Sequence, residues 1–459
     1  MRNHHVIKQV VKHKQNKQMK KGEGHLRWWQ LSLIGIGSIV GAGFFLGTGL
    51  SIKTAGPSIL IGYLLAGITT YIVFSALAEM TVNDPQEGSF RTYAKKAFGH
   101  SVGFMSGWMY WLSGILIMSS EIVALSTFTQ FWLPHIPLWI FSVIYASLGF
   151  GINLLGVKNF GQIESLFAIV KIATLVIFIG FGLLFLLGVI SPHDQVSTSN
   201  DGVGTFFPHG IKGLWSALIF IFFSFGGIGV MGVTSSELKY KRDIPKAGTG
   251  LIIALVTLFT LSLFFVMYLV SWTEIDESES PFVTALSAFS IPYLDSIFNI
   301  IIISAAFSTM VGTLFSISRV LVSLSEDGDA PKRLQVKNNR GVAMRALLLT
   351  AIGLSVSIGC SFILPDSMYE FVTTSAGVML ILNWLLILGS HIKLHPTYHD
   401  RTNTYKLKGY PFTSWMGIVL IVLTISGVIL HANERIGLMI SLGLIVVIWL
   451  CYKMFLRNK

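Results

Sequence analysis

The feature that most constrains this chain is a series of long apolar runs separated by short polar connections. A membrane-spanning helix needs about 20 apolar residues, and on that rule the sequence predicts about twelve spans. They cover residues 28–50, 57–82, 102–131, 137–155, 160–190, 212–234, 247–272, 291–324, 343–363, 366–390, 411–431 and 435–456. Of the 459 residues, 53% are hydrophobic and 12% are charged, against about 25% charged in a soluble domain. We therefore expect an all-α integral membrane protein.

Lysine and arginine are distributed unevenly over the connections. If the N-terminus is cytoplasmic, the connections on that side carry 28 of the 33 basic residues. The acidic segment 273–290 then falls outside and is expected to form an outer loop with a short surface helix. This positive-inside pattern predicts a cell-membrane protein with both termini in the cytoplasm. It also explains the net charge of +11 without a nucleic-acid partner.

Residues 1–27 form a polar, basic tail without the apolar core of a signal peptide. The tail's His4, His5 and His13 are expected to be solvated rather than to bind a metal. Cys360 and Cys451 lie in apolar runs and match neither a disulfide framework nor a metal-binding spacing. We expect no metal site.

Two spans carry glycines at mid-length, where they weaken a helix. Each interior glycine costs about 0.5–1 kcal/mol relative to alanine. The first span has its glycines within 31–46, and the sixth within 226–232; these are Gly35, Gly37, Gly41 and Gly43, and Gly226, Gly227, Gly229 and Gly232. Glycines also let membrane helices pack closely, and for either span alone that explanation is equally good. As a pair, however, they favour two broken helices.

The two breaks divide the spans into two sets of five, with two spans left over. Because five is odd, the second set must cross the membrane inverted relative to the first. Paired broken helices in inverted repeats typically mark the midplane substrate site of a transporter. We expect a tail (1–27), a first repeat (28–190), a second repeat (212–390) and two additional helices (411–456).

Few ionisable residues lie inside the spans, and such residues are functional candidates by default. Lys171 lies roughly 16 Å into the fifth span at 1.5 Å per residue. Burial penalises the charged form of a lysine, so Lys171 could carry a proton or replace a bound cation during transport. It could equally be a fixed counter-charge. Glu121 in the third span could take up protons or pack as a neutral residue, and Glu164 is expected to be structural.

Other polar residues have weaker signals. Ser304, Ser308, Thr309 and Thr313 of the eighth span could surround a cation-like position together with Lys171, although small polar residues also pack membrane helices routinely. Glu79 and Glu237 end the second and sixth spans, where we expect them to pair with loop Lys or Arg as gate or scaffold charges. Phe222, Phe223 and Phe225 flank the sixth-span break and are candidates for walls of a pocket.

Several motifs, in order, resemble those of amino acid permeases. They are GSIVGAGFFLG (37–47), AGP (55–57), AEM (78–80), P-x-x-GSF (85–90), FSFGGIG (223–229), Glu237, IPKA (244–247) and SRVLVSLSEDGDAPK (318–332). Over residues 25–455 the chain is similar to the amino acid–polyamine–organocation superfamily, and within it to the bacterial amino acid transporter family. The resemblance implies a five-plus-five inverted-repeat fold with broken helices 1 and 6 and two extra helices.

The resemblance also implies a site. The substrate carboxylate would bind at Gly41, Ala42 and Gly43, and the ammonium group at carbonyls near Ser38 and Ile39. Phe225, Gly226 and Ile228 would contribute from the sixth span. Lys171 matches the lysine that replaces sodium in proton-coupled relatives, which implies amino acid/proton symport with no cofactor besides the coupling proton.

The chain departs from this pattern at Gly229, where many relatives carry a glutamate. Without that carboxylate, a cationic side chain has one partner fewer, so we expect a neutral amino acid. A cationic amino acid or amine carrier and an amino acid exchanger are alternatives, and a non-transporting membrane sensor is a more distant one. No sequence pattern of an enzyme is found, so we do not expect catalysis, and no pattern defines an oligomeric state.

Overall fold

The computed structural model of the protein describes residues 26–86, 88–190, 206–275, 279–287, 289, 291, 293–361, 368–398 and 405–455. Apart from Leu26 and Arg27, the predicted basic tail with its three histidines lies outside these residues, as does the side chain of Cys360. Each of the twelve predicted spans is formed by one helix or, in the first and sixth spans, by helical pieces separated by a break.

The first five spans begin with a helix in three pieces. The pieces are α2 (Trp28–Ile39), α3 (Ala42–Phe45) and α4 (Gly47–Ala55). After the turn η1 (Gly56–Ser58) come α5 (Ile59–Asn83), the short α6 (Ser89–Phe98), α7 (His100–Gln130), α8 (Leu138–Asn153) and α9 (Val157–Leu186).

The next five spans repeat this order. The sixth span is divided into α10 (Gly210–Phe223) and α11 (Ile228–Thr234), and is followed by the turns η2 (Ser235–Glu237) and η3 (Lys241–Asp243). Then come α12 (Ile244–Leu269), η4 (Trp272–Glu274), the short α13 (Pro281–Ser287), α14 (Leu294–Glu326), η5 (Lys332–Gln335), α15 (Met344–Ser361), α16 (Met368–Leu394) and η6 (His395–Tyr398). Helix α13 confirms the short helix expected in segment 273–290, but five of its seven residues are buried, so it does not lie on the surface as expected.

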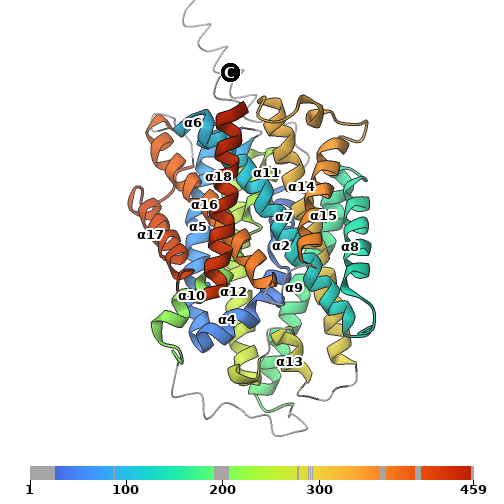
Figure 1. Cartoon of the computed structure of the whole chain (residues 1–459). Helices are drawn as coiled ribbons and strands as arrows, with labels where there is room; N and C mark the ends of the chain where they lie inside the picture. The colour runs from blue at the N-terminus through green and yellow to red at the C-terminus, as the bar shows by residue number, and fades with distance from the viewer. Residues whose placement is uncertain are drawn as a thin grey trace, which may run out of the picture.

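The short helices α6 and α13 occupy equivalent places in the two sets but opposite ends of the molecule. In Figure 1, α6 lies at the upper end and α13 at the lower end, and we call these the α6 end and the α13 end. Corresponding helices of the two sets pack against each other: α5 against α12, and α7 against α14. This is the arrangement that two inverted sets of spans produce.

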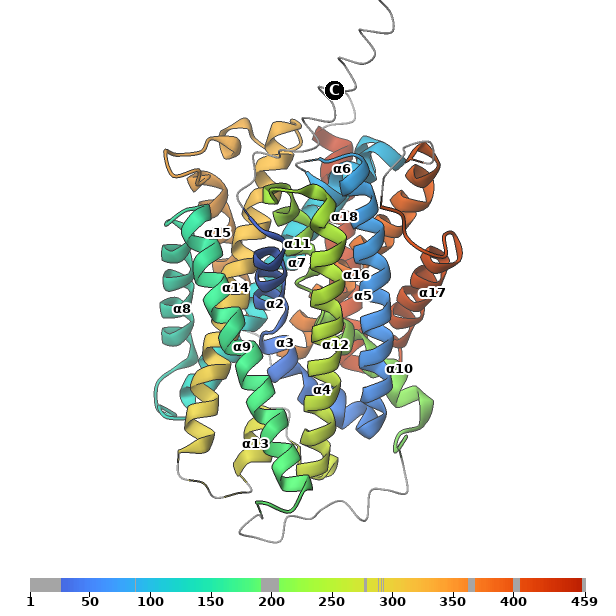
Figure 2. The ribbon, with the colours of Figure 1, turned by 180° about the vertical axis from the view of Figure 1, so that it is seen from behind.

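Two further helices, α17 (Phe412–Gly427) and α18 (Ala432–Phe455), complete the chain. Helix α17 packs against α5, α10 and α16, and α18 packs against α7 and α16. Figure 2 shows the opposite side, where α9 and α12 lie in front of the broken first helix. The substrate candidates on α2 and α3 are therefore enclosed by helices of both sets.

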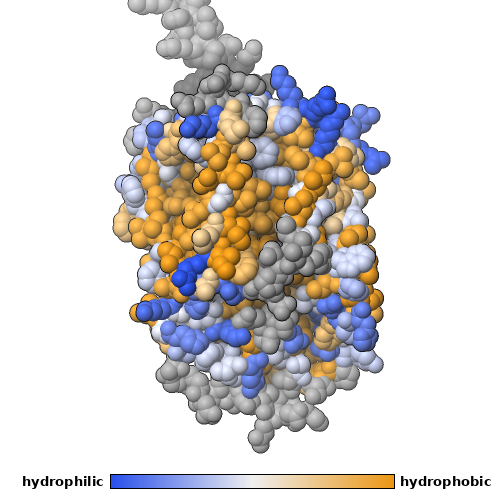
Figure 3. Space-filling view, in the orientation of Figure 1, coloured by the Kyte–Doolittle hydropathy of each residue, from blue (hydrophilic) through white to orange (hydrophobic). Residues whose placement is uncertain are grey.

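The surface has the polarity of a membrane protein. Among the described residues, eight helices are long and apolar enough to cross a membrane, and α8, α15 and α17 are shorter apolar helices. Side chains that face outward are apolar: Ile177 on α9 is 70% exposed and Met439 on α18 is 71% exposed. Figure 3 shows an orange, hydrophobic band between hydrophilic patches at the two ends. Since such a band is stable in lipid, the fold is that of an all-α multi-span membrane protein.

Candidate substrate site in the membrane core

The first helix breaks at Val40 and Gly41, within the glycine-rich stretch. Val40 leaves the helix with ψ of 96°, and Gly41 is extended with φ −144° and ψ −156°. The break frees carbonyls at the end of α2 and amides at the start of α3, and buried groups of this kind require partners. The partners come from α7, α9 and α14.

Lys171 and Thr309 satisfy the freed carbonyls. The Lys171 ammonium nitrogen donates to the Gly37 carbonyl and lies 3.2 Å from Thr309 Oγ1. The Thr309 hydroxyl lies within 3.2 Å of the Gly37 carbonyl and 3.1 Å of the Val40 carbonyl. Lys171 is fully buried on α9, so its amine is held directly against the broken helix.

Glu121 satisfies the freed amide on the other side of the break. Its Oε2 accepts a hydrogen bond from the Ala42 amide at 2.9 Å, and the residue is buried. An acidic side chain at the start of α3 also meets the positive end of the helix dipole. Glu121 therefore occupies an amide at which the resemblance had placed the substrate carboxylate.

Glu164, which we expected to be structural, lies beside the contacts of Lys171. It is fully buried on α9, its Oε1 accepts a 2.9 Å hydrogen bond from Ser308, and it lies close enough to Lys171 for electrostatic interaction. Its Oε2 has no hydrogen-bond partner among the described residues. A usable signal existed, because Glu164 precedes Lys171 by two helical turns and so shares its face. Ser308 thus contacts Glu164, and it is its neighbour Thr309 that contacts Lys171.

The sixth span breaks between Phe223 and Ile228, and this turn lies against the first break. The Ser224 hydroxyl donates to the Gly43 carbonyl at 2.9 Å, which joins the two broken helices. A Cβ atom on Gly227 would collide with the Ser38 carbonyl. Only glycine allows the two backbones to approach this closely.

A closed cavity lies where the two breaks meet. Its volume is about 20 Å³, which holds roughly one water molecule. Its lining combines backbone, small hydroxyl and apolar groups from α2, α7, α10, α14 and α16. The lining residues are Ser38, Ile39, Gly43, Tyr110, Ser113, Gly114, Ile117, Glu121, Phe223, Gly226, Gly227, Val230, Thr309, Thr313, Ile317 and Leu380. An amino acid does not fit into it without movement of these helices.

Several residues proposed from the sequence lie beside this cavity rather than on its wall. Phe222 packs against Trp384, with ring centroids 6.2 Å apart, and Phe225 packs against Phe259 at 5.4 Å. Both rings turn toward neighbouring helices, and in this closed conformation Phe223 provides the aromatic wall. Ile228 lines a separate, mostly apolar cavity of about 10 Å³.

Tyr110 separates the two cavities and explains the glycine at 229. Its ring would be 2.6 Å from a Cβ atom placed on Gly229, and its hydroxyl lies 2.8 Å from Ser316 Oγ. The space beside Gly229 is therefore filled by the Tyr110 ring of α7 and not by a side chain of the sixth span. Sequence reasoning did not single out Tyr110.

The α6 end is closed by backbone and charge contacts. Leu26 and Leu238 form an isolated parallel bridge, in which the Leu26 amide donates to the Glu237 carbonyl at 3.0 Å. The Glu237 carboxylate pairs with Arg319 at 2.8 Å, and both side chains are about 30% exposed. Glu237 thus has a basic partner as expected, although Arg319 belongs to α14 and not to a loop.

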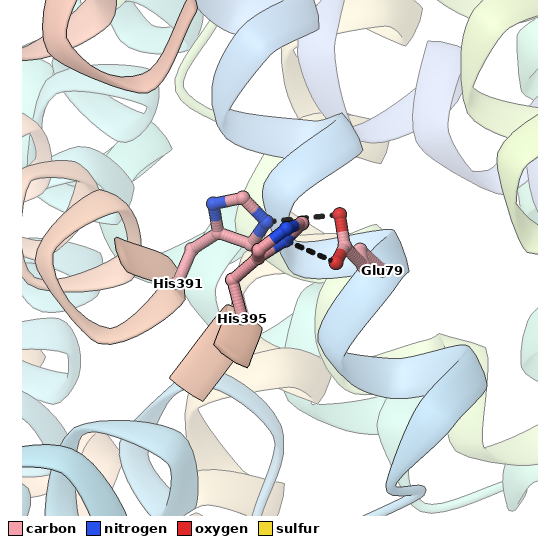
Figure 4. A group of neighbouring side chains, drawn as sticks. All are labelled: Glu79, His391 and His395. Atoms are coloured by element: carbon pink, nitrogen blue, oxygen red, sulfur yellow. Dashed lines mark hydrogen bonds and ion pairs between the residues drawn. The ribbon is translucent and has the colours of Figure 1, made fainter. Parts of the chain in front are cut away.

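Glu79 differs from the expectation, because its partners are histidines. Figure 4 shows the Glu79 carboxylate facing His391 of α16 and His395 of η6. The pairing with loop Lys or Arg that we expected for this residue is therefore wrong in the structure. Its cause is the return of the chain after α16, which brings both rings over the end of α5.

A second charged cluster lies at the α6 end around Arg91. The buried guanidinium contacts Asp327 at 2.7 Å and Asp329 at 3.1 Å, and donates to Ser323 Oγ at 3.0 Å. Lys95 pairs with Asp327 at 3.0 Å. The cluster joins α6 to the end of α14, so it holds the connection that follows the second span.

The α13 end carries a wider cavity, of about 850 Å³. Basic residues from the first and sixth spans, acidic residues from α16 and α18, and Trp272 line it. The charged and aromatic members are Lys53, His209, Lys212, Phe220, Trp272, Glu370, His431 and Glu434. This cavity is large enough for an amino acid, in contrast to the closed one between the breaks.

The paired breaks and the membrane-spanning helices define a multi-span membrane transporter. A family model for amino acid permeases matches residues 30–459. The chain belongs to the amino acid permease family, and the resemblance found in its motifs is confirmed.

Individual relatives agree with this assignment over nearly their whole length. An uncharacterized transporter, YcgH of Bacillus subtilis, is 40% identical, with 94% of this chain and 95% of YcgH covered. The aromatic amino acid transport protein AroP of Escherichia coli is 33% identical, with 87% of each chain covered. The uncharacterized amino acid permease YvbW of Bacillus subtilis is 32% identical, with 88% of this chain and 91% of YvbW covered.

Proposed function

We propose that this amino acid permease imports neutral amino acids by proton symport with alternating access. The observation that carries the proposal is the contact of Lys171 with the Gly37 carbonyl of the broken first helix. An ammonium group at this place can do what a bound cation does, namely hold the break in one geometry. When the proton leaves, the carbonyl loses its charged partner and the break can change shape.

The substrate would bind between the two breaks. Its carboxylate would take the Ala42 amide and the adjacent amides at the start of α3, where the helix dipole favours an anion. Its ammonium group would meet the carbonyls of Ser38 and Ile39, which line the cavity. For the carboxylate to bind, Glu121 must release the Ala42 amide, and a protonated Glu121 does so at less electrostatic cost than an ionised one.

The cavity lining supports a neutral substrate. Among the described lining residues, Glu121 alone is charged, and its carboxylate is engaged with the backbone. The apolar cavity beyond Tyr110, lined by Phe74, Phe90, Trp384 and others, would receive an uncharged side chain after widening from about 10 Å³ as the site opens. AroP is named for aromatic amino acids, which favours an aromatic member of this class.

The orientation follows from the basic residues. We place the α6 end in the cytoplasm, with both termini, because most Lys and Arg residues lie in connections at that end. The wide cavity at the α13 end would then face outward and admit the substrate. The repeats 28–190 and 212–390 would move against each other, and 411–456 would brace them.

The test is uptake of labelled neutral amino acids into proteoliposomes with and without an inward proton gradient. Wild type and Lys171→Ala are compared, together with a panel that includes lysine and arginine. We expect the gradient to stimulate uptake of neutral, above all aromatic, substrates in the wild type and not in Lys171→Ala.

Two results would overturn the proposal. Strong saturable uptake of lysine or arginine would contradict a neutral substrate and favour a cationic carrier. Counterflow that does not respond to a proton gradient would contradict symport and favour an exchanger. If a proton gradient still stimulates uptake by Lys171→Ala, the residue that carries the coupling proton would be Glu121 or Glu164 and not Lys171.

A further inference from the structure

Glu79, His391 and His395 form a compact buried cluster away from the candidate substrate site. Glu79 lies near the end of α5 and is fully buried, as is His391 near the end of α16, and His395 at the start of η6 is 8% exposed. Figure 4 shows both imidazole rings directed at the same carboxylate. The symport proposal uses none of the three.

The ligand atoms of the cluster converge. One nitrogen of each ring and a carboxylate oxygen lie within 4.8 Å of one another. His391 Nε2 is 3.0 Å from Glu79 Oε2, and His395 Nδ1 is 2.7 Å from Glu79 Oε1. Zinc binds nitrogen and oxygen at about 2.0–2.2 Å. For an angle at the metal between about 80° and 109°, two of its ligand atoms then lie roughly 2.7–3.4 Å apart. Both nitrogen–oxygen distances of the cluster fall in this range.

The contact between His395 and Glu79 is not satisfied by a hydrogen bond. His395 Nδ1 and Glu79 Oε1 have no hydrogen-bond partner among the described residues, although they are 2.7 Å apart. A nitrogen and an oxygen that both bind one metal ion lie this close to each other without a hydrogen bond between them.

We propose that Glu79, His391 and His395 bind a divalent transition-metal ion of the zinc type. Two imidazole nitrogens and one carboxylate are a ligand set that such ions prefer. The metal would offset the cost of burying a carboxylate beside two imidazoles. It would also use the lone pairs of the two atoms that have no hydrogen bond.

The groups around the cluster have the arrangement of a supporting shell. His391 Nδ1, the ring nitrogen that faces away from Glu79, lies 3.1 Å from Ser414 Oγ, which orients the ring. The Leu407 amide donates to Glu79 Oε2 at 2.6 Å. The Tyr410 ring stacks on His395 with centroids 3.6 Å apart. Outer partners of this kind orient metal ligands and raise their affinity.

Of these supporting residues, Leu407 and Tyr410 precede α17 and Ser414 lies in its first turn. A metal at the cluster would therefore join α5 of the first set to α16 and η6 of the second, beneath the start of the additional helices. Its role would be structural, at the α6 end, and would not depend on which substrate or ion the protein carries.

The test is metal binding by the full-length protein purified in detergent. Because His4, His5 and His13 could bind metal on their own, all variants carry these three replaced by serine. Metal-free protein is titrated with Zn²⁺, and zinc per chain is measured by elemental analysis after removal of free metal. Glu79→Gln, His391→Gln and His395→Gln are compared with the matched control His431→Gln, at the other end of the molecule.

We expect about one zinc per chain in the parent and in His431→Gln, with affinity lowered by about 100-fold or more in each cluster variant. Co²⁺ bound to the unsubstituted cluster should give the visible absorption bands of a low-symmetry site, a readout that needs no cluster variant to fold. Less than a tenth of a zinc per chain in the parent, or zinc that the cluster variants retain, would overturn the proposal and leave Glu79 in an ordinary hydrogen-bonded network.

Discussion

The Glu121 carboxylate accepts a hydrogen bond from the Ala42 amide at 2.9 Å, at the start of the second piece of the broken first helix. In the proposed symport a substrate carboxylate needs the same amide. Binding of substrate and protonation of Glu121 are then linked, because each removes the ionised side chain from the amide.

Glu121→Gln should separate exchange from coupling. The glutamine carbonyl can still accept from the Ala42 amide, but the side chain cannot take up a proton. We expect counterflow from preloaded vesicles to be kept within a few-fold and stimulation by an inward proton gradient to be lost. A variant that the gradient still stimulates as strongly as wild type would show that Glu121 has no part in coupling.

Gly41→Ala should disable the site through a steric clash. A Cβ atom there would lie 2.5 Å from Thr309 Oγ1 and 2.7 Å from Glu121 Oε1. Overpacking of this kind costs about 1–3 kcal/mol, so we expect a lower melting temperature and loss of uptake. Gly250→Ala on α12 is the control, because nothing lies within 4 Å of its Cβ position. Its melting temperature should be unchanged or higher, and equal behaviour of the two variants would contradict the clash.

The Glu237–Arg319 pair should stabilise the closed form of the protein at the α6 end. Glu237→Arg places two like charges about 3 Å apart, and we expect several-fold slower uptake because the closed form is disfavoured. The swap Glu237→Arg with Arg319→Glu should restore most of the rate. If the double variant is as slow as the single one, the pair contributes by some means other than its charge.

Arg91→Ala should destabilise the protein strongly. It removes the guanidinium partner of Asp329, whose side chain is fully buried, and leaves His100 as the remaining basic partner. Removing one partner of a buried ion pair costs about 3–5 kcal/mol. Lys96→Ala is the control, since the Lys96–Asp84 pair is exposed by 39% and 29% and such pairs contribute about 0–1 kcal/mol. Thermal unfolding in detergent measures both, and similar shifts would contradict the assignment.

The cluster around Arg91 also predicts that the thermal stability of the protein depends on pH. Burial would raise the pKa of Asp327, but hydrogen bonds from Lys95 and Arg91 outweigh it and hold the pKa below its usual value of 3.8. A lowered pKa stabilises the folded state above the unfolded value, and the effect is lost as the pH falls through the folded value. The difference in melting temperature between wild type and Asp327→Asn should be constant from about pH 7 to 5 and shrink below about pH 4. A difference that grows on acidification would contradict this.

Hydrophobic length and glycine position were sufficient to predict the spans and both breaks. Apolar runs end where helices end, within a few residues, because lipid requires backbone hydrogen bonds to be satisfied within each span. The breaks were predictable because interior glycines weaken a helix and stand at mid-length in two spans. Gly227 has a second role that the sequence did not reveal, because a side chain there would collide with the Ser38 carbonyl.

The partners of charged residues were less predictable. Glu79 was expected to pair with a basic loop residue, yet His391 and His395 reach it from the other end of the chain. Such contacts depend on how α16 and the segment after it pass over α5, and no local pattern encodes that. Glu164 is different, because its spacing from Lys171 along one helix placed it on the same face. The roles of the predicted site residues remain predictions.

The closed cavity of about 20 Å³ has a consequence for any affinity measured on this protein. A ligand that needs an open site binds only the fraction of molecules that are open, so its apparent dissociation constant is the intrinsic one divided by that fraction. A substitution far from the ligand that loosens the contacts of Leu26 would therefore appear as tighter binding, although no atom touching the ligand had changed. Affinities for one substrate compared across variants report on the closed state as much as on the site.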